Sequence, residues 1–137
     1  MDKIDIPIWD IKYEVGVEDI DFQHRYFLKL INRFCDNVGT SDCSDNIDCY
    51  IHELVLYAKF HFCSEENLMR SFKYPDLQRH IDLHRKVIVD LTNELALVEF
   101  HEHNNKNIIE FLTSWFLDHT VNEDSKFGNF YKNIYQG

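Results

Sequence analysis

Apolar residues recur along most of this chain at alternating steps of three and four, the spacing that places side chains on one side of an α-helix. The two-residue alternation typical of half-buried strands is not seen in these stretches. Only four Gly and two Pro interrupt the 137 residues. The pattern therefore predicts an all-α protein.

The breaks in the pattern predict four long helices, at about 20–38, 46–71, 76–100 and 106–121. Gly39 can end the first helix, and Pro75 lies just past the end of the second. An extended N-terminal arm precedes them, and a short C-terminal helix is expected at about 125–135. Short connections favour antiparallel neighbours, so we expect an up-down-up-down antiparallel four-helix bundle. The length predicts a single domain, residues 1–137.

The charge balance narrows the function. The chain has 24 acidic and 14 basic residues, a formal charge of -10, and no Lys/Arg cluster that could follow a nucleic-acid backbone. We therefore expect neither nucleic acid nor an anionic membrane as a partner. The first ten residues lack the features of a signal peptide, and no stretch approaches 18 uninterrupted apolar residues. A soluble, cytoplasmic protein is expected.

The four cysteines do not have the spacing of a zinc site. They are Cys35, Cys43, Cys49 and Cys63. With no secretory context to favour disulfides, we expect reduced thiols, although a link between Cys43 and Cys49 stays open.

Every predicted helix has at least one histidine on its apolar stripe, and the second helix adds a glutamate. These polar residues are His24, His61, Glu65, His80, His84 and His119. Burying an unpaired carboxylate costs several kcal/mol or forces its protonation, so the cluster needs a compensating positive charge. A metal would supply it. The alternative, five ordinary core histidines with hydrogen-bond partners, fits any one of them better than all five together.

The number and type of these groups favour two iron ions. His61 and Glu65, like His80 and His84, are four residues apart, which separates them by about 40° around the helix and about 6 Å along it. One zinc ion is usually satisfied by four ligands, often thiolates, so this set is too large. Mixed imidazole and carboxylate donors suit iron. The Glu-x-x-His pattern of ferritin-like di-iron proteins is absent from the chain.

Several neighbouring residues are not expected to be ligands. Cys63 points about 200° around the helix from His61. Three further histidines should lie at the surface: His52, His101 and His103. The roles of some other side chains stay open. Glu66 and Asp21 could orient an imidazole or be solvated, and Trp115 could belong to the core or to the pocket wall. One of three tyrosines could form a hydrogen bond near the site: Tyr13, Tyr26 or Tyr57.

The ordered set of motifs resembles hemerythrin, and more closely the single-domain bacterial hemerythrins, from Trp9 to about Tyr131. The matching elements are Val15-Gly16-Val17 with Ile20-Asp21-Phe22-Gln23-His24, His61-Phe62 with Glu65-Glu66 and Met69, His80 with His84, and Trp115 with His119 and Asp124. Asp124 lies five residues after His119, beyond the predicted helix end, so its place in the site depends on the resemblance alone.

The resemblance implies an asymmetric pair of irons. His80, His84 and His119 would hold one iron, and His24 and His61 the other, which keeps an open position. Glu65 and Asp124 would bridge the pair, together with an oxo or hydroxo group. Dioxygen would bind reversibly at the open iron, which implies a non-enzymatic oxygen-binding protein and leaves room for a separate redox or oxygen-consuming partner protein.

The surroundings of the open iron decide between carriage and catalysis. Phe27, Ile31, Leu112 and Trp115 are expected to form a dry apolar shell, which would hinder water-assisted loss of superoxide. Phe116 and Thr120 depart from the family, where leucine and isoleucine are usual. The alternatives are a di-iron sensor, an enzyme acting on oxygen, peroxide or nitric oxide, and an iron store. The lack of an obvious general acid in the inferred pocket favours binding over turnover.

Overall fold

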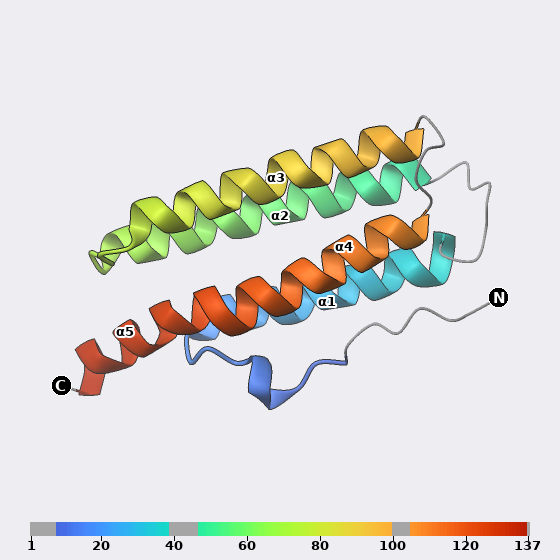
Figure 1. Ribbon diagram of the computed structural model, residues 1–137. Helices are drawn as coiled ribbons and strands as arrows, with labels where there is room; N and C mark the ends of the chain where they lie inside the picture. Colours follow the sequence, from blue (N-terminus) through green and yellow to red (C-terminus); the bar gives the residue numbers. More distant parts are fainter. Residues whose placement is uncertain (1–7, 39–46, 100–104, 137) are drawn as a thin grey trace.

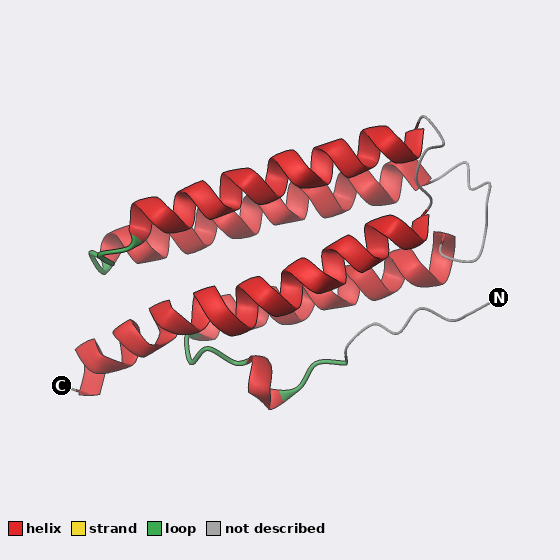
Figure 2. Cartoon of the chain, in the orientation of Figure 1, coloured by secondary structure: helices red, strands yellow, loops and turns green. Residues whose placement is uncertain are grey.

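Four helices form an antiparallel bundle in the computed structural model, which describes residues 8–38, 47–99 and 105–136 (Figure 1). The helices are α1 (Glu18–Val38), α2 (Ile47–Ser71), α3 (Leu77–Glu99) and α4 (Asn105–Asp118). A π-helical segment, η2 (His119–Asp124), continues α4 into α5 (Ser125–Gln136). Consecutive helices contact each other, and α1 also contacts α4, which closes the bundle. Within the described ranges every regular element is helical (Figure 2), so the predicted fold class is confirmed.

One predicted boundary is wrong. The apolar pattern predicted a helix end after Val121 and a separate last helix, whereas the backbone stays helical from Asn105 to Gln136. In the π-helical segment the apolar spacing slips by one residue, because each turn contains an extra residue. A pattern search that assumes α-helical spacing interprets this slip as a break. None of the described helices has an apolar run long enough to cross a bilayer.

The arm before α1 is folded against the bundle. A short 3-10 turn, η1 (Ile11–Tyr13), is followed by Gly16, whose φ of +88° is in the region that favours glycine. The Asp21 carboxylate accepts hydrogen bonds from the backbone N–H groups of Val15 (2.7 Å) and Gly16 (3.1 Å). Asp21 therefore anchors the arm at the start of α1 and does not orient an imidazole.

Two apolar clusters fill the interior on either side of a polar layer. The larger cluster includes Phe27, Ile31, Phe34, Leu54, Ile108 and Leu112. The smaller one, near α5, consists of Val15, Val17, Ile20, Met69, Tyr74 and Phe127. Along each helix the predicted polar stripe residues lie between members of the two clusters. The bundle thus surrounds the polar groups with apolar packing at both ends.

Replacing Gly128 with Ala should destabilise the fold. A Cβ at this position would lie 2.0 Å from the carbonyl oxygen of Val15, which is backbone and has little room to move. We expect the free energy of unfolding to fall by about 1–3 kcal/mol, the usual cost of overpacking, despite the better helix propensity of alanine. Urea denaturation would measure the loss. Asn129→Ala, an exposed change in the same helix, is the control, and equal stability of both variants would contradict the packing argument.

Candidate metal centre

All seven predicted ligands converge in the polar layer of the bundle. None is more than 5% exposed. They are His24, His61, Glu65, His80, His84, His119 and Asp124. Their donor atoms form two groups: one contains His80, His84 and His119, and the other contains His24 and His61. Both groups include Glu65 and Asp124, and within each group the donor atoms lie within 4.8 Å of one another.

Glu65 directs one carboxylate oxygen toward each group. Its Oε1 lies 2.7 Å from Nε2 of His80 and 3.1 Å from Nε2 of His84. Its Oε2 lies 3.4 Å from Nε2 of His61 and 3.7 Å from Nε2 of His24. Glu65 comes from α2, one turn after His61, so a single stripe position supplies an oxygen to both sides of the cluster.

Asp124 divides its oxygens in the same way. Its Oδ1 lies 2.9 Å from Nε2 of His80 and 3.0 Å from Nε2 of His119, and its Oδ2 lies 2.8 Å from Nε2 of His24. In a regular α-helix a residue five positions after His119 would be turned about 140° away. The i→i+5 bonding of the π-helical segment brings it back over the same face. This is why periodicity alone did not select Asp124.

The arrangement of lone pairs fits metal ions better than hydrogen bonds within the cluster. Nε2 of His61, Oε2 of Glu65 and both oxygens of Asp124 are buried and form no well-aligned hydrogen bond with any described residue, although nitrogens lie within 3 Å of the Asp124 oxygens. Buried polar atoms without partners cost about 1–3 kcal/mol each, and more when charged. The donors therefore point toward shared positions between them, as ligands of two cations would.

Gln23 holds the ring of His61. Its Nε2 donates to Oγ of Ser64 (3.0 Å), which leaves Oε1 to accept from Nδ1 of His61 (2.7 Å). Because Nδ1 of the neutral His61 ring carries the proton that Gln23 accepts, Nε2 is unprotonated and faces the cluster. The hydroxyl of Tyr57 donates to the Gln23 carbonyl (2.7 Å), so Tyr57 is the tyrosine that bonds near the site. Sequence reasoning gave Gln23 no role, although its place beside His24 could have suggested one.

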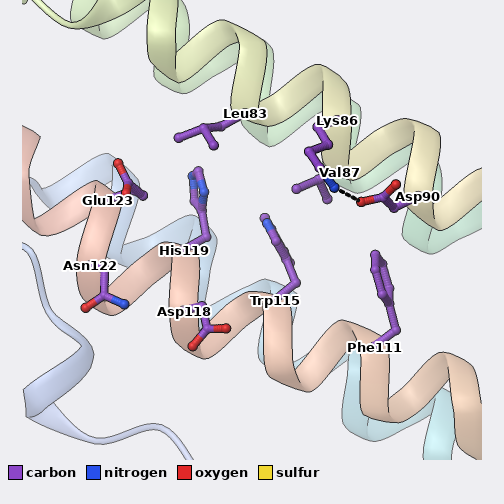
Figure 3. A pocket seen from close by; sticks show the side chains of 10 residues that line it. All are labelled: Leu83, Lys86, Val87, Asp90, Phe111, Trp115, Asp118, His119, Asn122 and Glu123. Carbon is purple, nitrogen blue, oxygen red and sulfur yellow. Dashed lines mark hydrogen bonds and ion pairs between the residues drawn. The ribbon is translucent and has the colours of Figure 1, made fainter.

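Glu66 and two aromatic rings fix the orientation of His84 and His119 in the three-histidine group. Oε2 of Glu66 lies 2.8 Å from Nδ1 of His84, which shows the orienting role that the sequence left open. The ring of Phe62 stacks on His84 at 4.0 Å with an interplanar angle of 8°. Trp115 is half-buried and stacks on His119 at 5.5 Å. Trp115 and His119 also line an open groove of about 440 Å³ between α3 and α4–η2 (Figure 3).

The remaining predicted residues lie outside the cluster. His52 is exposed, as expected, while His101 and His103 lie outside the described residues. Cys49 and Cys63 are exposed thiols, and Cys43, with any link it makes to Cys49, is also outside the described ranges. Tyr13 is buried and Tyr26 is exposed, and no hydrogen bond joins either of them to the described site residues.

Without a metal, protons supply positive charge to the cluster. Burial opposes protonation of His24, His80 and His119, but their contacts with the Asp124 and Glu65 carboxylates outweigh it and raise the pKa of each, to about 9, 9 and 10 respectively. Burial dominates at His61 and lowers its pKa to about 3. Burial would raise the pKa of both carboxyls, but the surrounding histidines hold the pKa of Glu65 and Asp124 below their ordinary values.

A helical bundle with this buried set of histidines and shared carboxylates defines a class of metal-binding helical proteins. The chain belongs to the hemerythrin family: the family model described as the hemerythrin HHE cation binding domain matches residues 15–131. The resemblance to hemerythrins that the motifs indicated is thereby confirmed.

Relatives cover most of the chain. A bacteriohemerythrin from Clostridium acetobutylicum is 27% identical over 126 residues, covering 88% of this chain and 97% of its own. A myohemerythrin from Theromyzon tessulatum is 29% identical over 119 residues, with 87% and 88% covered. The crystal structure of a wild-type hemerythrin matches the fold with a TM-score of 0.79 at 24% identity, over 88% of this chain and 94% of that one.

Metal affinity should depend steeply on pH. Because neutral imidazole binds metal, an ion must displace the protons that the raised pKa values keep on His24, His80 and His119. The apparent affinity of the metal-free protein for Co²⁺ should therefore rise by at least about tenfold per pH unit between about pH 6.5 and about pH 9. Competition with a chelator would measure it. His52→Ala should leave the profile unchanged, and a flat profile in the parent protein would refute the protonated cluster.

Removing the Gln23 side chain should weaken one half of the centre. In Gln23→Ala the ring of His61 loses its hydrogen-bond partner, so the affinity of the two-histidine group should fall by about 10–100-fold, while the three-histidine group is less affected. Titration with Co²⁺ followed by absorption would separate two binding steps. Gln78→Ala, which removes only an exposed contact with Asp82, is the matched control. Identical titrations of the two variants would contradict the role of Gln23.

Proposed function

We propose that this chain is a dioxygen-binding protein with a non-heme di-iron centre. The observation that carries the proposal is the unequal set of donors around two shared carboxylates. In the proposed centre His80, His84 and His119 hold one iron and His24 and His61 the other. Glu65 and Asp124 would bridge the irons, together with an oxo or hydroxo group. Membership of the hemerythrin family supports the choice of iron.

The protein contributes an asymmetric site in apolar surroundings. When bound, the iron pair supplies one electron from each metal to a dioxygen held at the open position. With one histidine fewer, the His24 and His61 side would leave a position on its iron open. The ring of Phe116 stands edge-on to His24 at 6.0 Å, and Phe27 stacks against Phe116 at 6.5 Å. These rings exclude water from the open side, which favours release of intact dioxygen over oxidation.

The apolar shell contains the residues expected from the sequence, and Phe116 packs beside them. Phe27, Ile31 and Leu112 are buried, as expected, and Trp115 packs edge-on against Phe27 at 5.5 Å while it also stacks on His119. Phe116 stands edge-on to His24 at a position where the family commonly has leucine. Thr120 is buried beside His119. A bulky ring at the open iron should restrict the size of the ligands that can bind there.

Binding without turnover is the proposed activity, with an enzyme or sensor as the alternative. Among the described residues, the ring neighbours of His24 are His61 and Phe116, and neither is a proton donor that a reaction could use. The proposal includes a cytoplasmic setting, since the exposed Cys49 and Cys63 would stay reduced there. It also includes a separate redox or oxygen-consuming partner protein.

An optical experiment tests the proposal. Ferrous iron is added without air, then air is admitted and removed. We expect two irons per chain and a visible absorption band that appears with air and disappears without it. Oxygen consumption with irreversible oxidation would replace the proposal by an oxidase or peroxidase, and one zinc per chain would overturn the di-iron centre. His61→Ala should abolish the band with the helices intact by circular dichroism, whereas the exposed control His52→Ala should keep it.

A further inference from the structure

The outer surface of α1 and α2 carries a group of large apolar side chains that the bundle does not bury. Phe22 is 69% exposed, Phe60 58%, Leu56 53% and Tyr26 37%. The half-buried ring of Tyr57 joins the two helices, lying 5.3 Å from Tyr26 and 6.1 Å from Phe60. We call these five residues the aromatic face.

The aromatic face is larger than scattered surface hydrophobics would explain. Among the described residues, the other strongly exposed large apolar side chains are Ile8 and Ile11 on the N-terminal arm and three that occur singly, Val89 on α3, Val121 on η2 and Ile134 on α5. The aromatic face presents roughly 400 Å² of apolar surface, given that a whole aromatic side chain buries on the order of 150–250 Å². Contiguous patches of this size commonly mark an interaction site.

The charges beside the aromatic face are of both signs. Lys29 is exposed on α1, two turns after Phe22 and one turn after Tyr26. Arg33 of α1 lies 3.9 Å from Glu53 of α2. The chain as a whole has a formal charge of -10. Two acidic molecules repel each other over most of their surfaces, but two such mixed faces can meet without net repulsion. This charge pattern fits a second copy of the same chain.

The geometry of the face also fits a twofold contact. A twofold axis between neighbouring antiparallel helices places α1 of one copy on α2 of the other. Phe22 and Tyr26 then meet Leu56 and Phe60 of the second copy, and the same contact repeats on the other side of the axis. Aromatic pairs are favourable at such contacts, and aromatic residues are enriched in the buried centre of interfaces.

We propose that two copies of this chain associate through the aromatic face to form a symmetric dimer. A stable interface buries about 800 Å² on each partner, and the aromatic face would form its apolar centre. The interface lies close to the metal centre. Tyr57 belongs to the aromatic face, and its hydroxyl donates to the carbonyl of Gln23, whose side chain holds His61. Dimer formation therefore immobilises the outer wall of the two-histidine group.

Analytical ultracentrifugation of the metal-free protein over two decades of concentration tests the dimer. The parent chain should sediment as a dimer at high concentration. The double variant Phe22→Gln/Phe60→Gln should raise the dimer dissociation constant by at least about hundredfold, because both residues lie at the centre of the interface. Glutamine keeps good helix propensity at these exposed sites, so the thermal melt should stay close to that of the parent.

Val89→Gln is the matched control, an exposed apolar residue on a different helix, and it should leave the dimer intact. A monomeric parent chain at every concentration would overturn the proposal. So would a double variant that dimerises as strongly as the parent, or a control that dissociates equally. Because the test uses metal-free protein, its result does not depend on iron or dioxygen binding.

Discussion

The cost of burying two carboxylates and five imidazoles in an apolar bundle is the constraint on which this structure depends. Glu65 and Asp124 are buried, and three of their four oxygens accept no well-aligned hydrogen bond from any described residue. Only positive charge between the donors can compensate for this, whether protons on histidines or metal ions. Burial of the two apolar clusters, one at either end of the polar layer, stabilises the fold and offsets the cost of burying the polar groups.

The side chains around the ligands convert this cluster into an ordered centre. Gln23 bonds the outer nitrogen of His61 and Glu66 that of His84, while the ring of Phe62 stacks on His84 and that of Trp115 on His119. These contacts limit ring rotation, so each inner nitrogen stays directed at its group. The asymmetry of three histidines against two is therefore built into the packing and does not depend on which ion is bound.

Much of the fold was predictable, because helical spacing and buried polar residues leave a strong signal in sequence. The predicted bounds of the first three helices lie within two residues of those observed, and six site residues came from the apolar stripes alone. Asp124 required the family resemblance. The π-helical segment was not predicted, Gln23 was given no role, and the orienting role of Glu66 was left open, since these roles depend on how side chains of different helices meet. The single domain over 1–137 stays a prediction.

The π-helical segment has a consequence for the packing of the last helix. One extra residue in a turn rotates every later residue by about 100° around the helix axis, relative to its direction in a regular α-helix. In a regular continuation of α4, Phe127 would lie within about 60° of Leu112 and Phe116 around the axis. After the π-helical segment it is turned about 100° from that direction and is fully buried in the smaller cluster. The same rotation therefore sets the directions in which Asp124 and the apolar side of α5 face. If the segment wound as a regular α-helix of the same length, a metal ligand and a core residue would both turn away from their observed directions.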